Sequence, residues 1–152
     1  MLFFEELRLG DTFRTPEHTV TAEEIIAFGR QFDPQPFHTD AAAARPTLFG
    51  QLVASGWHTA ALSMGLMVRG EMRLDGGVIG QGVDGLRWPR PVRPGDRLRV
   101  MMEVVEVSPE PSRTGRGKIK LFCRTLNQDG KAVQEMTANL LIGRRDSASG
   151  TI

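Results

Sequence analysis

The chain has 152 residues and a formal net charge of +1, with 19 Lys and Arg against 18 Asp and Glu. This length fits one domain with an ordinary hydrophobic core, and the balanced charge argues against a nucleic-acid-binding protein. A single cysteine, Cys123, excludes an intramolecular disulfide framework and a multi-cysteine metal site. No apolar run approaches the roughly 18 residues of a membrane span, and the N-terminus is acidic where a signal peptide would be basic. We therefore expect a soluble, cytoplasmic protein with no membrane partner.

The charges divide unevenly between the two halves of the chain. Residues 1–83 carry 10 acidic and 6 basic side chains, a balance of −4, whereas residues 84–152 carry 8 acidic and 13 basic ones, a balance of +5. An anionic ligand that approaches the basic half would account for this asymmetry, and so would ordinary solvated strand faces.

Short elements are predicted in the first part of the chain. Residues 10–20 indicate a short strand region with a proline interruption. Thr21 is followed three residues later by Glu24, which is the spacing of a capping box, so an amphipathic helix is expected to follow. The helix should end near Asp33, because a proline follows and the residue before a proline avoids the helical conformation.

The next segments predict an irregular loop and then a long helix. Residues 33–38 contain two prolines and predict neither a regular helix nor a central strand. Asp40 is expected to cap a brief helix over residues 41–45. The longest helical pattern spans residues 56–69, and no charged residue occurs from 50 to 68. This helix is therefore predicted to be buried on nearly all sides.

The second half of the chain predicts strands. They are expected over residues 78–88, 97–107, 118–126 and 133–144, the second of them with the pattern of an edge strand. Asn-Gln-Asp-Gly at 127–130 predicts a hairpin turn between the last two. A buried helix needs its apolar surface covered, and a curved antiparallel sheet wrapped around it is the economical arrangement for this length. The predicted fold class is therefore α+β.

Three residues stand out as candidates for chemistry. Asp33 and His38 lie five positions apart across the two-proline segment, which can hold two side chains at a fixed separation. A carboxylate and an imidazole that face one water can orient it and move its proton, although the same pair also occurs in ordinary polar loops. Gly56 opens the long helix, where a free N–H and the positive end of the helix dipole suit a developing oxyanion. A glycine that only permits a tight turn is the alternative.

Other reactive side chains show weaker patterns. His18 is expected at the surface or at a strand edge, and His58 is expected as a core histidine or a pocket wall. Cys123 lies in a predicted strand and is expected to be an inert apolar residue. The sequence contains no Gly-x-Ser-x-Gly element, no metal-ligand spacing and no dinucleotide fingerprint.

Three segments of the chain resemble one known family. Residues 28–40, Phe-Gly-Arg-Gln-Phe-Asp-Pro-Gln-Pro-Phe-His-Thr-Asp, resemble the hydratase motif of MaoC-like dehydratases and (R)-specific enoyl-CoA hydratases. Residues 49–56 resemble the family segment that leads into a central helix, and residues 86–96 resemble its strand–turn–strand signature.

This resemblance implies a hot-dog fold, in which an antiparallel β-sheet wraps around a long central α-helix. It implies one domain over residues 1–145, and we expect the tail at 146–152 to be frayed. It also implies a homodimer or a higher homo-oligomer, because members with one hot-dog unit build the acyl pocket at a subunit interface. The implied substrate is an acyl-CoA or an acyl carrier protein thioester, with no cofactor and no metal.

The resemblance also assigns roles to residues. Asp33 and His38 match the acid/base pair that holds the water, and Gly56 matches the backbone donor to the thioester carbonyl. The family's usual Asn is replaced by Gln35, which is expected to shape the loop together with Pro36. The implied function is a hydro-lyase that reversibly hydrates trans-2-enoyl thioesters to 3-hydroxyacyl thioesters.

Other residues favour functions different from hydration or are candidates to contact the substrate. A serine that supports the site in some members aligns with Met64, one position from Ser63. This departure and Gln35 together favour a non-catalytic protein that binds acyl thioesters. A hot-dog acyl-CoA thioesterase is a further alternative, disfavoured because residues 56–68 contain no acid. The candidate contacts for CoA phosphates are Arg113, Arg116 and Lys118.

Overall fold

The computed structural model describes residues 1–145, so the prediction of a frayed tail at 146–152 lies outside the described residues. After a 3-10 turn at Phe4–Glu6, the elements in chain order are β1 (Thr12–Arg14), β2 (His18–Thr19), α1 (Ala22–Phe32), α2 (Pro36–Thr39), α3 (Ala41–Ala44), α4 (Gly56–Arg69), β3 (Val78–Arg87), β4 (Arg97–Val107), β5 (Gly117–Leu126) and β6 (Ala132–Ile142).

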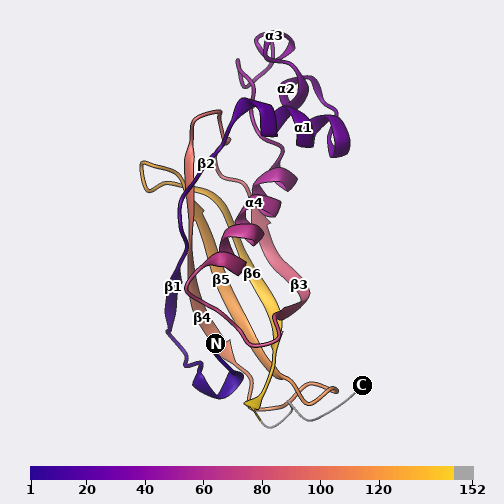
Figure 1. The fold of residues 1–152 in the computed structure, drawn as a ribbon. Coiled ribbons are helices and arrows are strands. Elements are labelled where there is room, and N and C mark those ends of the chain that lie inside the picture. The colour runs from indigo at the N-terminus through magenta and orange to yellow at the C-terminus, as the bar shows by residue number, and fades with distance from the viewer. Residues whose placement is uncertain (146–152) are drawn as a thin grey trace.

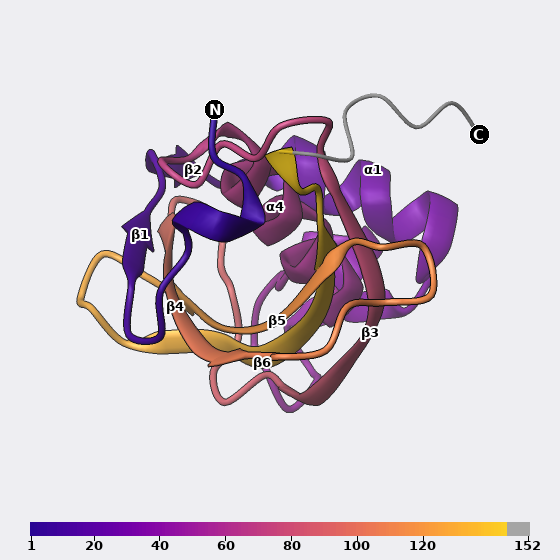
Figure 2. The ribbon, with the colours of Figure 1, turned by 90° about the horizontal axis from the view of Figure 1, so that it is seen from below.

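An antiparallel sheet curves around the helix α4. The strand order is β1-β4-β5-β6-β3, and β2 pairs with β4 beside β1. Seen from below, the strands wrap around α4, while α1, α2 and α3 lie together above the sheet (Figure 1, Figure 2). The predicted α+β class and the hot-dog arrangement are confirmed.

The core lies between α4 and the concave face of the sheet. Val100, Met102 and Val104 alternate with more exposed residues along β4, and Leu66 and Met67 of α4 are buried against the same cluster. Full burial of such a side chain contributes roughly 1.5–3 kcal/mol to stability. This packing fixes α4 against the sheet, and with it the position of the first turn of the helix.

Two sequence expectations about the fold are wrong. The strand β4 is not an edge strand, because β1 and β2 pair along its outer side. Its alternating charged residues mark the solvent face of the sheet and carry no information about pairing. The helix α4 is also not buried on nearly all sides, since Trp57, Met64 and Val68 are 60%, 45% and 61% exposed. The sheet of one chain covers only one side of it.

Candidate active site

The end of α1 and the start of α2 bring Asp33 and His38 together. The capping box of Thr21 and Glu24 begins α1 as predicted, and the N–H of Asp33 donates to the Gly29 carbonyl at 2.9 Å to end it. His38 Nε2 lies 3.3 Å from Asp33 Oδ2, and the His38 side chain is buried. The structure therefore places the two predicted side chains in contact.

The loop between them is more helical than the sequence indicated. Residues 33–35 are irregular, but Pro36–Thr39 forms one helical turn with Pro36 at its start. Proline is well suited to this position, because it has no N–H to leave unpaired and its fixed φ matches the helix. Gln35 precedes this turn, and its side chain is directed back toward the carboxylate of Asp33, to which it donates.

The neighbours of His38 fix which nitrogen carries a proton. His38 Nδ1 lies 2.7 Å from the carbonyl oxygen of Val53, which can only accept, so Nδ1 carries a hydrogen. The other nitrogen, Nε2, faces Asp33 at a distance longer than a strong charge-assisted hydrogen bond. When protonated, Nε2 donates to the carboxylate; when deprotonated, it presents a lone pair to a shared water. Nε2 is therefore the position at which this pair can exchange a proton.

The carboxylate of Asp33 receives hydrogen bonds on both oxygens. Gln35 Nε2 donates to Oδ1 at 2.7 Å, and Ser55 Oγ donates to Oδ2 at 2.6 Å. Burial alone would raise the pKa of Asp33, but the bonds from Ser55 and Gln35 and the charge of His38 hold its pKa below the usual value. Asp33 is therefore ionised over the neutral range, and its carboxylate can accept a hydrogen bond from a water or from His38.

The first turn of α4 lies beside this pair. Ser55 is the N-cap residue but forms no side-chain cap, and the first bond of the helix runs from the Thr59 N–H to the Ser55 carbonyl. Within residues 1–145, the backbone N–H of Gly56 has no hydrogen-bond partner. Because Gly56 directly follows the serine that contacts Asp33, a free helix N–H and the Asp33–His38 pair share one location.

Ser55 is the site residue that sequence reasoning missed. The sequence pointed to position 64, a methionine, and to its neighbour Ser63 as the place of a supporting serine. Ser63 bonds the Thr59 carbonyl and the Thr125 hydroxyl inside the core, and Met64 is half exposed. The available signal was a serine immediately before the helix-opening glycine, a usual N-cap position, whose hydroxyl is instead bonded to Asp33.

Replacing Ser55 by Ala should raise the pKa of Asp33, because the fully buried hydroxyl no longer stabilises the charged form. We expect the acid limb of the pH–rate profile, measured for the enoyl thioester hydration that the sequence predicts, to move to higher pH, with kcat about tenfold lower. The matched control is Ser63→Ala, a buried serine on α4 without contact to Asp33. It should lower the melting temperature and leave the acid limb in place. An unmoved acid limb in Ser55→Ala would contradict this role.

The remaining histidines and the cysteine lie where the sequence predicts. His18 is partly exposed and pairs with Glu24 at 2.9 Å, and His58 is a buried histidine stacked on Phe28 at 4.8 Å between ring centroids. Cys123 is buried in β5, and burial raises the pKa of its thiol to about 12. A thiol in this state is not a nucleophile at neutral pH.

His58 makes stability depend on pH. Burial lowers its pKa in the folded protein, and its Nδ1 has no partner among the described residues. Below about pH 6.5 the unfolded chain binds a proton that the folded protein does not, so the free energy of unfolding falls as the pH falls toward the folded pKa. His58→Leu should reduce this slope, which reaches about 1.4 kcal/mol per pH unit, in urea unfolding between pH 7 and 5. Parallel slopes for both proteins would refute the assignment.

The predicted phosphate contacts lie far from Asp33 within one chain. Arg113 and Arg116 belong to the connection between β4 and β5, and Lys118 is the second residue of β5. This connection is at the end of the sheet opposite α1 and α2 (Figure 1). A role for them at the same site therefore requires a second copy of the chain.

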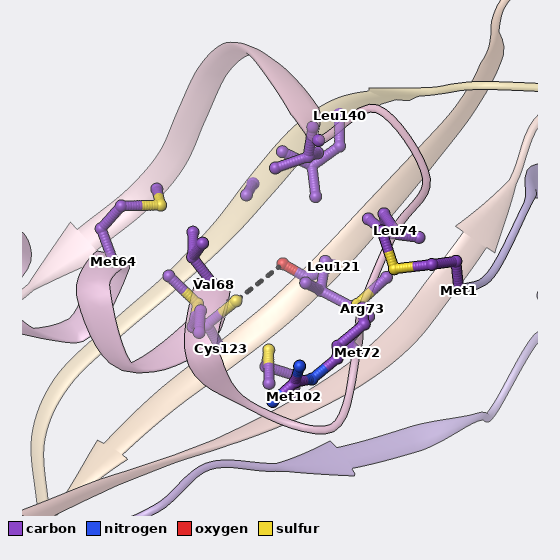
Figure 3. A pocket seen from close by; sticks show the side chains of 14 residues that line it. Met1, Met64, Val68, Met72, Arg73, Leu74, Met102, Leu121, Cys123 and Leu140 are labelled. Atoms are coloured by element: carbon purple, nitrogen blue, oxygen red, sulfur yellow. Dashed lines mark hydrogen bonds between the residues drawn. The ribbon is translucent and has the colours of Figure 1, made fainter.

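An apolar cavity of about 290 Å³ lies between the C-terminal half of α4 and the sheet (Figure 3). Its walls include Met64 and Met67 of α4, together with Met102, Cys123 and Leu140 of the sheet. The two methionines therefore line a cavity as well as pack the helix. Neither Asp33 nor His38 lines this cavity.

Comparison with known proteins identifies the family. The family model of the MaoC like domain matches residues 5–121. The chain belongs to this family. It is 31% identical over 149 residues to the 3-hydroxybutyryl-CoA dehydratase of Methylorubrum extorquens, covering 97% of this chain and 88% of that one. The family and its relatives support a hydratase or dehydratase role.

Solved structures of this family share the fold. A MaoC-like dehydratase from Rhodospirillum rubrum is 48% identical, with a TM-score of 0.90, over 95% of this chain and 99% of that chain. The unliganded R-hydratase PhaJ1 of Pseudomonas aeruginosa is 28% identical, with a TM-score of 0.77, over 94% of this chain and 86% of that chain. Among residues 1–145, no helix is long and apolar enough to cross a membrane, and no three His, Cys, Asp or Glu side chains are grouped to hold a metal ion.

Proposed function

We propose that the protein is a hydro-lyase that reversibly adds water to the double bond of trans-2-enoyl thioesters, giving 3-hydroxyacyl thioesters. The observation that carries this proposal is the contact of Asp33 Oδ2 with His38 Nε2 at 3.3 Å, beside the unpartnered N–H of Gly56. The pair can hold and deprotonate a water, and the helix N–H can donate a hydrogen bond to the thioester oxygen as negative charge develops on it.

The reaction follows from these positions. The thioester oxygen accepts a hydrogen bond from the Gly56 N–H, and the positive end of the α4 dipole draws electron density from the conjugated double bond. A water held between Asp33 and His38 loses one proton to the pair as its oxygen bonds to the β-carbon. The pair then returns a proton to the α-carbon, so the elements of one water are added. This chemistry requires no cofactor, because the thioester itself delocalises the charge of the enolate.

A second copy of the chain is part of the proposal. The exposed apolar face of the chain includes Trp57, Met64 and Val68 of α4, and the edge strand β3 adds Ile79 and Val83, which are also about half exposed. A homodimer that buries this face would enclose the site, and it would bring a second set of basic residues toward the carrier of the acyl group. CoA and acyl carrier protein are the two candidate carriers, and the apolar cavity beneath α4 is a candidate for the acyl chain.

The test is direct hydration of crotonyl-CoA and longer trans-2-enoyl-CoAs by the purified protein, followed by loss of the absorbance of the conjugated thioester. We expect turnover on at least one chain length, with the 3-hydroxyacyl thioester as product. Absence of hydration on every enoyl thioester, CoA or carrier-protein bound, would overturn the proposal.

A protein that binds acyl thioesters without turnover is the second candidate. The Met-lined cavity favours it, because this apolar space suits an acyl chain and is lined by neither Asp33 nor His38. Calorimetric titration with a saturated acyl-CoA measures binding alone. Binding together with no hydration would select this function.

A further inference from the structure

The indole of Trp88 occupies the space that a side chain at position 56 would need. Trp88 directly follows β3, which ends beside the first turn of α4 (Figure 1). A Cβ built on Gly56 would lie 2.6 Å from Cδ2 and Cε2 of this indole and 2.8 Å from Cζ2. The ring therefore packs directly on the Cα of Gly56. Glycine is required at position 56 because the aromatic ring fills the space of its side chain.

The orientation of this indole is fixed from the sheet. Trp88 Nε1 donates to Gln134 Oε1 at 2.9 Å, and Gln134 is fully buried at the start of β6. Trp57 lies against the same indole with its ring at 79° and 5.3 Å between centroids. Trp88 is thus held between a buried amide on one side and an aromatic ring on another. Trp88 remains 40% exposed, and these two contacts set the orientation of its ring.

The first turn of α4 lacks the side-chain cap that usually fixes the start of a helix, so the packing of the Trp88 indole on Gly56 matters more for its position. A serine at an N-cap usually accepts a backbone N–H and so fixes the first turn. Ser55 forms no such bond, and its hydroxyl contacts Asp33 instead. The lateral position of the Gly56 N–H is then determined by the backbone and by the indole packed on its Cα.

We propose that Trp88, oriented by Gln134, is a positioning residue that holds the Gly56 N–H in the direction of the thioester oxygen. The inference rests on the proposed function and adds to it the residues that fix the donor. An oxyanion donor works only when its position is set before the reaction, and a displacement of a few tenths of an ångström weakens the hydrogen bond in the transition state. Among residues 1–145, Trp88 forms no hydrogen bond or ring contact with Asp33 or His38, so its effect should fall on the carbonyl and leave proton transfer unaltered.

The experiment compares Trp88→Phe, Gln134→Leu and the double variant in enoyl-CoA hydration. Each single variant should lower kcat about tenfold with KM within threefold, and the double variant should be no slower than the worse single one, because both act through one contact. The control is Gln128→Leu, which removes hydrogen bonds to Asp96 and the Arg97 N–H but does not contact Trp88. It should keep kcat within twofold. Trp88→Phe retains an aromatic ring and so disturbs the fold least.

A spectroscopic readout separates positioning from general damage. The absorption of 2,4-hexadienoyl-CoA shifts to longer wavelength when its carbonyl is polarised, and it can be recorded in the Asp33→Asn background, where turnover is suppressed. Adding Trp88→Phe should reduce this red shift by half or more. The role of Trp88 would be overturned if the wild type hydrates enoyl-CoA but Trp88→Phe and Gln134→Leu keep its kcat and Trp88→Phe leaves the red shift unchanged. Absence of hydration by the wild type would instead overturn the proposed function itself.

Discussion

Replacing Asp33 by Asn is expected to lower kcat for enoyl-CoA hydration by about 10²–10⁴-fold, the range that a positioned acid or base contributes. Asn has the same shape, and its oxygen can still accept the hydroxyl of Ser55, so the loop should keep its conformation. Gln35 is exposed and can turn its amide to suit the new neighbour. The substitution removes the negative charge beside His38 Nε2. In the proposed mechanism this charge accepts a proton or stabilises the imidazolium of His38.

His38→Gln provides the partner measurement. If Asp33 and His38 act on one water as a unit, the double variant should be about as slow as the slower single variant, because removing either member already disables the pair. Melting temperatures of all three variants show whether the fold is retained. Activity of Asp33→Asn within tenfold of the wild type, with hydration of enoyl-CoA otherwise present, would show that the carboxylate takes no part in proton transfer.

Local signals predicted the elements that carry the site. The Thr21–Glu24 spacing gave the start of α1, and the prolines after Asp33 indicated a rigid connection to His38. Both signals act within a few residues, so they can be read without knowing the tertiary structure. The curved sheet also followed from a local pattern, an uncharged helix and four strands, because that helix needed a cover.

Contacts between distant segments could not be predicted in the same way. Ser55 is 22 residues from Asp33, and Gln134 is 46 residues from Trp88. Nothing in the sequence around either partner specifies the other. The exposed face of α4 was missed for a related reason: an uncharged helix indicates that its surface is covered, but it does not distinguish cover by the same chain from cover by a second copy.

Gly29 shows how helix packing fixes the positions of Asp33 and His38. It lies within α1, where a change from Gly to Ala normally stabilises a helix by roughly 0.5–1 kcal/mol. A Cβ at this position, however, would overlap the backbone carbonyl of His38 and lie 3.0 Å from its Cβ. The carbonyl of the same glycine accepts the N–H of Asp33 at 2.9 Å. Gly29 thus contacts the backbones of both members of the pair.

Gly29→Ala is therefore expected to lower the free energy of unfolding by about 1–3 kcal/mol, the usual cost of an overpacked contact, in spite of the gain in helix propensity. It should also lower kcat by up to about 10²-fold, because α2 must move away from α1 and carries His38 with it. Urea unfolding and the hydration assay measure the two effects.

Gly65→Ala is the matched control for this change, because Gly65 is also a helical glycine, near the middle of α4. A Cβ there would approach only the guanidinium of Arg69, at 3.0 Å, and this flexible side chain can move aside. Helix propensity then decides the outcome, and the free energy of unfolding should rise by roughly 0.5–1 kcal/mol. Opposite signs for the two substitutions would show that the contact with His38, and not the helix itself, requires glycine at position 29. A stabilised and fully active Gly29→Ala would mean that α2 can shift away from α1 without displacing His38 from Asp33.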